Sequence, residues 1–278
     1  MAVDLHTHSR VSDGSDSPSD LIANAASAGL AAIALTDHDT LDGLDEAQLA
    51  ADRHGIRLIR GVELSLEWSR GGMHLIVLFL GRDGPLQARL SDLQAARDTR
   101  NTRMVDLLQS LDYDITLDEL IAEAGGGVVG RPHMAAILVR KGYFPDPPAV
   151  FDELLATGRP GYLGRDRLDP VEAIQLARKS KGVPIIAHPH TLGLDTADEN
   201  AEAISRLKAA GLSGIECHYG DYPLSQQQEL ADTTRRFGLI PSGGSDYHGT
   251  YKAGLELGAG RGELHVPDTV LEELEADQ

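Results

Sequence analysis

The chain of 278 residues contains a single cysteine, few aromatic residues and a deficit of basic side chains. Because Cys217 has no second cysteine to pair with, an intrachain disulfide is excluded, and thiolates cannot dominate a metal site. Phe, Trp and Tyr make up only 4% of the chain, so the core must consist mainly of Leu, Ile, Val and Ala. Lys and Arg total 25 against 43 Asp and Glu, and the resulting net charge of −18 makes long nucleic acid an unfavourable partner.

Long apolar runs are also missing. The apolar run at residues 75–80 is far too short to span a bilayer. The amino terminus shows no basic segment followed by an apolar stretch, which is the pattern of a signal peptide. We therefore expect a cytoplasmic protein without a membrane partner, and the sequence leaves its oligomeric state open.

Short apolar runs alternate with helix-like segments in two parts of the chain, and this alternation favours a parallel sheet or barrel. The region from 83 to 165 instead has a helical pattern, so we interpret it as a helical insertion, or cap domain, between barrel segments 1–82 and 166–278. We expect strands at 3–6, 31–35, 57–59, 73–79, 183–187, 214–217 and 239–242, and barrel helices at 17–28, 44–54, 170–181, 201–210, 225–237 and from 266 onward.

Residues that commonly bind metal ions follow most of these apolar runs. The segment Asp4-Leu5-His6-Thr7-His8 places two imidazoles two residues apart, so the period of a strand directs both to one side. Such residues at the ends of many strands indicate a multinuclear metal site at one end of a barrel. The nine candidate ligands, here called the donor cluster, are His6, His8, Asp13, His38, Glu63, His74, His188, Asp246 and His248.

Together these motifs resemble the PHP (polymerase and histidinol phosphatase) family, a relative of the amidohydrolases, over about residues 1–82 and 166–266. The resemblance implies an α/β fold, a distorted (β/α)7 barrel with two or three metal ions at the carboxyl ends of its strands. The insertion, with Gly130-Arg131-Pro132-His133, resembles a narrower subfamily. That subfamily contains 3′,5′-nucleoside bisphosphate phosphatases and 5′-to-3′ exoribonucleases that act on short RNA.

The resemblance also implies how the donor cluster divides among the ions. Many relatives carry histidine where this chain has Asp13, and the harder carboxylate suits manganese, magnesium or iron. We expect two or three divalent ions, with manganese favoured and iron or zinc as alternatives. One ion would be held by His6, His8, Glu63 and Asp246, a second by Glu63, His74 and His188, and a third by Asp13, His38 and His248.

Such a site suits phosphoester hydrolysis, because bridged metal ions lower the pKa of a shared water and offset charge on phosphoryl oxygens. We predict a phosphatase that removes the 3′-phosphate of a small nucleotide such as pAp by metal-activated hydroxide, with Glu63, Asp246 and His248 as catalytic residues. The alternatives are a 5′-to-3′ exoribonuclease on short RNA, a histidinol-phosphate-type phosphatase and a non-catalytic metal-stabilised module.

Substrate contacts are predicted from polar residues beside the ligands and at the start of an inserted helix, where an anion would meet the helix amino terminus. Each of them also has a structural reading, such as helix capping, loop ordering or a turn hydroxyl. The predicted substrate-binding residues are Ser9, Arg131, His133, Arg165, His190 and His218.

Overall fold

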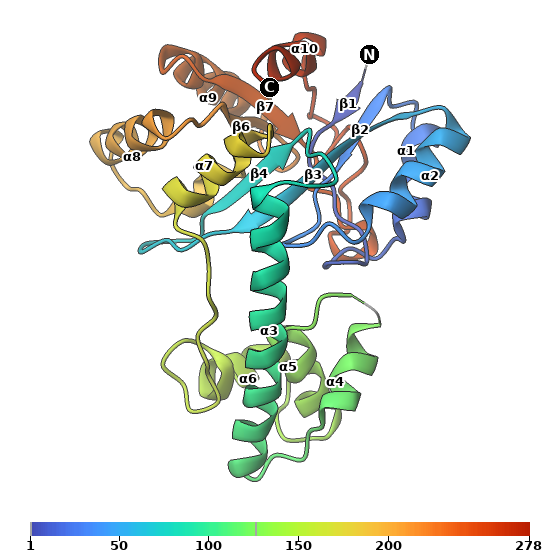
Figure 1. The fold of residues 1–278 in the computed structure, drawn as a ribbon, viewed down its shortest axis with the longest axis vertical. Coiled ribbons are helices and arrows are strands. Elements are labelled where there is room, and N and C mark those ends of the chain that lie inside the picture. Colours follow the sequence, from blue (N-terminus) through green and yellow to red (C-terminus); the bar gives the residue numbers. More distant parts are fainter. Residues whose placement is uncertain (1, 126) are drawn as a thin grey trace. The chain divides into compact units, whose positions relative to one another are not determined.

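The structure, a computed structural model, describes residues 2–125 and 127–278 and contains one seven-stranded sheet (Figure 1). The strands follow one another in sequence order across the sheet. A parallel bridge between Thr7 and Tyr247 brings the chain after the first strand beside the chain after the last, so the sheet forms a nearly closed barrel. The predicted α/β fold, a distorted (β/α)7 barrel, is confirmed. The strands are β1 (Val3–Asp4), β2 (Ala32–Leu35), β3 (Arg57–Ser65), β4 (His74–Leu78), β5 (Val183–Ile186), β6 (Gly214–Tyr219) and β7 (Ile240–Gly244).

One strand of the barrel runs against the others, although the alternation of strands and helices favoured parallel strands. β4 pairs antiparallel with both β3 and β5. The connection at 66–73 is too short for the crossover of about a dozen residues that parallel neighbours need. Ser65 lies opposite His74 in the register, so the start of β4 lies at the carboxyl end of β3. His74 therefore reaches the edge where the other strands end, although it begins its strand.

The helices of the barrel begin at the capping signals that the sequence contains. Ser17 accepts the backbone N–H of Asp20, and Asp169 caps α7 in the same way. Helix α8 begins four residues before the predicted start, because Thr196 and Glu199 form a capping box. The helices are α1 (Pro18–Ser27), α2 (Leu44–His54), α7 (Pro170–Lys179), α8 (Ala197–Ala209), α9 (Leu224–Arg236) and α10 (Asp268–Ala276), with 3-10 turns at Pro189–Leu192 and Gly249–Tyr251.

The barrel core is aliphatic, as the scarcity of aromatic residues requires. One buried cluster contains Ile59, Leu78 and Val183 from the strands of the sheet. Val266 and Leu274 from the last segment of the chain belong to the same cluster. A second cluster, which includes side chains of α1, β2 and α2, is also built from Leu, Ile and Ala. Burial of these side chains, worth roughly 25 cal/mol per Å² of apolar surface, holds the strand ends in fixed positions.

The chain divides into two compact units, residues 1–90 with 167–278, and residues 91–166. The second unit has its own apolar cluster, built around Met104, Leu108, Leu120 and Met134, and its described residues contain no strand. The interpretation of 83–165 as a cap domain remains our proposal. The helices of this region are α3 (Pro85–Ser110), which begins in the first unit, α4 (Leu117–Ala124), α5 (Arg131–Arg140), α6 (Pro147–Val150) and a π-helical turn (Phe151–Leu155).

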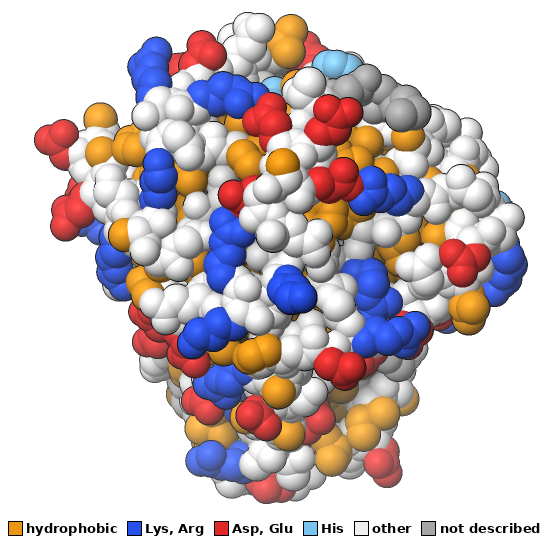
Figure 2. All heavy atoms as spheres, turned by 45° about the horizontal axis from the view of Figure 1, so that its top comes forward, with side chains coloured by type: hydrophobic (Ala, Val, Ile, Leu, Met, Phe, Trp, Pro, Cys, Tyr) orange, Lys and Arg blue, Asp and Glu red, His pale blue; other side chains and the backbone are white. Residues whose placement is uncertain are grey.

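The lengths of the helices and the charges on the surface concern two predicted partners, a membrane and long nucleic acid. Among the described residues, no helix is both long enough and apolar enough to cross a membrane. Figure 2 shows acidic and basic side chains interspersed over the face that it draws. The excess of acidic residues is therefore not concentrated on that face.

Candidate active site

The structure brings all members of the donor cluster together at one edge of the barrel. They come from segments that lie as much as 242 positions apart, from His6 to His248, and neighbouring members lie within 3.6 Å of one another. Three subsets of their nitrogen and oxygen atoms lie within 4.8 Å of one another and could hold metal ions: His8 with Asp13, His38 and His248; His6 with His8 and Glu63; and His38 with Glu63 and His74.

The first group consists of His6 Nε2, His8 Nε2, Glu63 Oε2 and Asp246 Oδ1. The two histidine nitrogens are 3.1 Å apart, and each is 3.2 Å from Glu63 Oε2. Asp246 Oδ1 lies 3.3 Å from His8 Nε2 and 3.6 Å from His6 Nε2. Ligands about 2.1 Å from one ion lie about 3.0 Å apart in an octahedron and about 3.4 Å apart in a tetrahedron. These separations suit four ligands of a single ion.

The second group uses the other oxygen of Glu63. Glu63 Oε1 is 2.9 Å from His74 Nδ1 and 2.9 Å from His188 Nε2. The two oxygens of one carboxylate thus face different sets of imidazoles. This is the arrangement expected of a carboxylate that bridges two ions.

The third group surrounds Asp13, whose side chain is 53% exposed. Its Oδ1 lies 3.3 Å from His248 Nε2 and 3.6 Å from His8 Nδ1, while its Oδ2 lies 3.6 Å from His38 Nε2. His38 Nδ1 in turn lies 3.2 Å from Glu63 Oε2. His8 and His38 therefore face two groups each, whereas the family resemblance assigned each of them to one.

Unpaired buried atoms show that the donor cluster fits metal ions. Glu63 and His8 are fully buried, and Glu63 Oε2, His8 Nδ1 and His38 Nδ1 have no hydrogen-bond partner among the described residues. A buried polar atom without a partner costs about 1–3 kcal/mol. Cations placed among these atoms would remove that cost, so the residues present suit divalent ions.

The charges and burial of Glu63 and His38 favour the protonation states in which these two residues bind metal. Burial alone would raise the pKa of Glu63, but the charges of His38 and His6 and a hydrogen bond from His188 hold it well below its usual range. Burial lowers the pKa of His38 to about 4. At neutral pH Glu63 is thus a carboxylate and His38 a neutral imidazole, and both are forms that can donate electron pairs to a cation. Burial lowers the pKa of His8, but hydrogen bonds to Asp246 and Glu63 raise it to about 9, so this imidazole must lose a proton when it binds an ion.

Two members of the cluster have unusual backbone conformations. His188 has φ 24° and Asp246 has φ 56°, in the left-handed region that residues with a Cβ rarely adopt. Such conformations cost about 1–3 kcal/mol and gather at functional sites. Nearby, a Cβ on Gly244 would come within 2.5 Å of His6 N, so the close approach of β7 to the chain after β1 requires glycine.

Two predicted substrate contacts in the barrel, Ser9 and His218, have side-chain partners within the protein. The Ser9 hydroxyl donates to Asp37 at 2.7 Å, so its single proton is already used to hold the loop before Asp13. His218 is buried, its side chain has a hydrogen bond with Gln227, and His265 and Arg235 are its electrostatic neighbours. The pairing of β6 with β7 also shifts register between Glu216 and His218.

His190 lies next to the donor cluster and is exposed. Its ring is 6.0 Å from the ring of His188, centroid to centroid, and its Nδ1 lies 2.6 Å from the hydroxyl of Tyr222. Burial and the charge of His188 lower the pKa of His190. A neutral, accessible imidazole at this position could donate to a substrate oxygen through Nε2 if Nδ1 accepts from Tyr222.

The remaining predicted contacts lie in the second unit. Arg131 donates to the carbonyl of Leu155 at 2.9 Å, and its guanidinium lies over the Tyr162 ring at 5.2 Å. His133 Nδ1 accepts the backbone N–H of Gly130, which precedes helix α5. The ring therefore caps this helix, which is the structural alternative to substrate binding.

Arg100 is a residue that the sequence analysis missed. It is 8% exposed, and burial together with the charges of Arg131 and Arg165 lowers its pKa to about 10. Three guanidinium groups close enough to repel one another form a cationic cluster within the second unit. Arg100 lies inside a long helix, where nothing in the pattern distinguishes it from a solvated arginine.

The sequence analysis also missed polar residues that contact the donor cluster. Tyr219 donates its hydroxyl proton to Asp246 Oδ2 at 2.8 Å, and Lys252 forms an ion pair with the same oxygen. Glu216, which is fully buried on β6, contacts His6 and His188. A carboxylate within an apolar strand was the available signal, because an unpartnered buried charge is costly.

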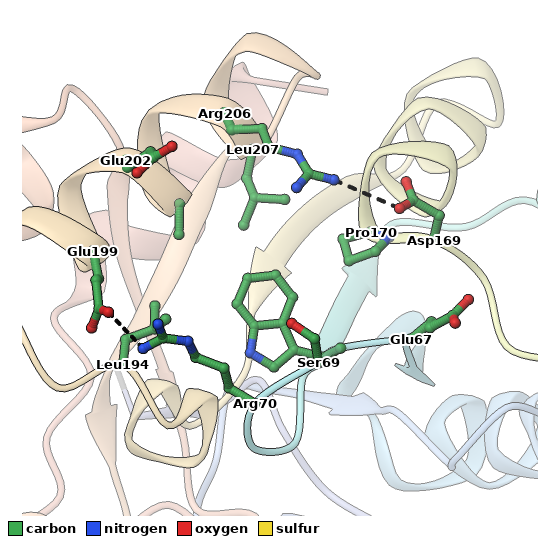
Figure 3. Close-up of a pocket in the computed structure, with 12 residues that line it drawn as sticks. Glu67, Ser69, Arg70, Asp169, Pro170, Leu194, Glu199, Glu202, Arg206 and Leu207 are labelled. Atoms are coloured by element: carbon green, nitrogen blue, oxygen red, sulfur yellow. Dashed lines mark ion pairs between the residues drawn. The ribbon is translucent and has the colours of Figure 1, made fainter.

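A separate hollow of about 370 Å³ lies beside Trp68 in the barrel unit (Figure 3). Arg70 pairs with Glu199 at 2.7 Å on one side, and Arg206 lies 3.7 Å from Asp169 on the other. None of the residues that line this hollow belongs to the donor cluster. The candidate active site is therefore assigned from the donor atoms and not from this hollow.

Comparisons with known proteins agree with this fold. The sequence model of the PHP domain matches residues 4–156. The chain is 34% identical over 262 residues to a 3′,5′-nucleoside bisphosphate phosphatase of Chromobacterium violaceum, covering 92% of this chain and 90% of that one. It is 35% identical over 270 residues to a 5′-3′ exoribonuclease of Haemophilus influenzae, covering 96% of each.

A solved structure extends the similarity to three dimensions. An amidohydrolase from Chromobacterium violaceum, with bound sulfate and no metal, matches with a TM-score of 0.80 and 32% identity, over 100% of this chain and 97% of that one. The fold and the donor cluster define a hydrolase of the metal-dependent phosphoesterase class. The chain belongs to the PHP domain family, so the predicted family membership is confirmed.

Proposed function

We propose that this phosphoric monoester hydrolase removes the 3′-phosphate of nucleoside 3′,5′-bisphosphates, so that pAp and water give AMP and phosphate. The observation that carries the proposal is Glu63, whose two oxygens face two different sets of imidazoles at 2.9 to 3.2 Å. In the reaction a water oxygen bonds to phosphorus, the bond from phosphorus to the 3′ oxygen breaks, and that oxygen takes up a proton.

The donor cluster would hold two or three divalent ions. When bound, such ions supply a water of lowered pKa and positive charge beside the phosphoryl oxygens. We favour manganese, which suits the carboxylates of the cluster, with iron or zinc, which suit its imidazoles, as alternatives. The proposed sets are His6, His8, Glu63 and Asp246 for the first ion, Glu63, His74 and His188 for the second, and Asp13, His38 and His248 for the third, with His8 also facing the third.

The protein's own groups hold this arrangement in place. The Nδ1–H of His248 donates to the backbone carbonyl of Asp246 at 2.8 Å, which leaves its Nε2 lone pair directed toward Asp13. Asp246 keeps Oδ1 for the first group because Tyr219 and Lys252 engage its Oδ2. Glu63, Asp246 and His248 are accordingly our proposed catalytic residues.

The arginines of the second unit support a substrate with two phosphates. The pKa of Arg100 is lowered by burial and by its cationic neighbours Arg131 and Arg165, and a bound anion would relieve that repulsion. Planar guanidinium groups also bind phosphate through paired hydrogen bonds. We propose that Arg131 and Arg165 bind the second phosphate of the nucleotide. His190 is our proposed contact on the barrel side.

A 5′-to-3′ exoribonuclease acting on short RNA is the second candidate. It is favoured by the similarity to the Haemophilus influenzae enzyme along almost the whole chain. The net charge of −18 disfavours long strands, and that prediction is open to direct test. Histidinol phosphate fits less well, because its cationic amine would be repelled by the arginines near Arg100.

The deciding experiment is a comparison of phosphate release from pAp and from 5′-AMP in the presence of manganese. We expect release from pAp and almost none from AMP, because AMP is the product. Equal rates on the two compounds would refute the specificity. A ladder of shortened products from labelled RNA, formed faster than phosphate from pAp, would favour the exoribonuclease instead.

A further inference from the structure

Glu216 is fully buried on β6, and each of its carboxylate oxygens contacts a different member of the donor cluster. Its Oε1 lies 2.9 Å from His6 Nδ1. Its Oε2 accepts the backbone N–H of His188 at 2.6 Å. His6 belongs to the first group of donor atoms and His188 to the second, so one side chain contacts both groups from outside.

We infer that Glu216 is a positioning residue, which selects the metal-binding tautomer of His6 and holds the backbone that presents His188. The inference rests on the proposed metal site, but it concerns a residue outside the donor cluster. Glu216 itself contacts neither a metal ion nor the substrate in this account.

The tautomer argument follows from the two nitrogens of His6. Its Nε2 lies 3.1 Å from His8 Nε2 and 3.2 Å from Glu63 Oε2, so Nε2 is the atom that would bind an ion. A neutral imidazole has one N–H, and Nε2 can offer a lone pair only when the proton is on Nδ1. A carboxylate accepts and does not donate, so Glu216 at Nδ1 selects this tautomer.

The backbone argument concerns His188. With φ 24° and ψ 69° its backbone is strained, which costs free energy. The short hydrogen bond from its N–H to the Glu216 carboxylate is charge-assisted and offsets part of that cost. In this conformation His188 Nε2 reaches Glu63 Oε1 at 2.9 Å.

Substitution of Glu216 by glutamine distinguishes a positioning role of its carboxylate from a role that depends only on the volume of the side chain. Both partners of Glu216 must donate, whereas an amide of the same size offers one acceptor and one donor. If the amide oxygen keeps the His188 N–H, the amide NH₂ faces His6 Nδ1 and forces the His6 proton onto Nε2. Glu216→Gln should therefore weaken metal binding with little change in side-chain volume.

The experiment uses the full chain in two measurements. Titration of the metal-free protein with Mn²⁺ should show affinity lowered by about 10- to 100-fold in Glu216→Gln, the usual effect of losing such a partner. With ¹⁵N-labelled histidine and diamagnetic Zn²⁺, the Nδ1–H signal of His6 should be present in the native protein and lost in the variant. Glu216→Asp, which keeps both acceptors on a shorter arm, should retain that signal and lose less affinity.

Asp4→Asn is the matched control. Asp4 is also fully buried and accepts backbone N–H groups, from His6, Ser245 and Gly258, but it has no hydrogen bond to an imidazole ring among the described residues. This variant should lower the unfolding temperature while the Nδ1–H signal of His6 persists. If Glu216→Gln does not fold, the native protein carries the test, and absence of the Nδ1–H signal of His6 from the Zn²⁺-bound native protein would overturn the inference.

The outcomes also separate this inference from the proposed function. Native affinity and an intact Nδ1–H signal in Glu216→Gln would overturn the positioning role, while pAp hydrolysis by the native protein could still stand. Equal losses of Mn²⁺ affinity in Glu216→Gln and Asp4→Asn would reduce Glu216 to a general structural role. A native protein that binds Mn²⁺ but releases no phosphate from pAp would refute the function and leave the role of Glu216 intact.

Discussion

The barrel edge and the second unit gather charge in opposite ways. At the barrel edge, carboxylates alternate with imidazoles, and the pKa of Glu63 is lowered by the positively charged forms of its neighbours. In the second unit, Arg100 lies among Arg131 and Arg165, and its pKa is lowered by burial and by groups of its own sign. The first arrangement suits cations and the second suits an anion.

The largest effect should come from Glu63, because both of its oxygens face donor groups. Glu63→Gln should lower the rate of phosphate release from pAp by on the order of 10³-fold while the fold is retained. Circular dichroism and a phosphate assay provide the check. Glu67→Gln, an exposed carboxylate on the loop after β3, is the control and should keep the native rate. Native turnover by Glu63→Gln would remove the basis of the proposed site.

The proposed phosphate-binding role of the arginines in the second unit is tested by substitution of Arg165. Arg165→Ala should raise the KM for pAp by about 10- to 100-fold, since a hydrogen bond to a charged group contributes about 1.5–3 kcal/mol. Its kcat should change much less. The matched control is Arg140→Ala, an exposed arginine of the same unit that pairs with Glu123. Equal KM values for the two variants would contradict a phosphate-binding role of Arg165.

A smaller effect is expected at Asp13, the exposed member of the donor cluster. Asp13→Ala should lower activity by roughly 10-fold and reduce the number of bound ions by one, because an exposed ligand contributes less to a site than a buried one. Asp13→His restores the residue type of many relatives and should recover both. Counting bound metal by elemental analysis distinguishes the two variants. Unchanged metal content in Asp13→Ala would show that the third group does not bind an ion.

The smallest effect concerns Cys217, away from the chemistry. Burial raises the pKa of its thiol from 9.0 to about 12. Above pH 9 the unfolded chain therefore releases a proton that the folded chain retains, and the free energy of unfolding falls by about 1.4 kcal/mol per pH unit until pH 12. Denaturant unfolding between pH 8 and 10 should show a steeper fall for the native protein than for Cys217→Ala. Equal slopes would contradict the raised pKa.

The donor cluster was predictable because its signal is local. His6 and His8 follow a short apolar run, as do His38 and His188, and the carboxyl ends of barrel strands meet at one edge. Helix starts were equally predictable where a capping residue stands before a proline, as with Ser17. The direction of β4 was not, because it depends on the length of a connection and not on the residues of the strand.

Residues that contact other site residues, and not a metal ion or the substrate, were harder to predict from the sequence. Glu216 lies in the middle of a strand and Arg100 in the middle of a helix, so neither is marked by a strand end or a motif. His218 follows a strand-like run and is predicted as a substrate contact, but it is buried and has a hydrogen bond with Gln227, next to a register shift in β6. Bulges and long-range contacts of this kind are set by the packing of the whole barrel.

The most direct test of the account is the metal content of the purified native protein, measured together with phosphate release from pAp before and after chelation. We predict two or three divalent ions per chain, loss of release when the ions are removed, and recovery when manganese is restored. Hydrolysis of pAp at an unchanged rate by protein that holds no divalent ion would contradict the account.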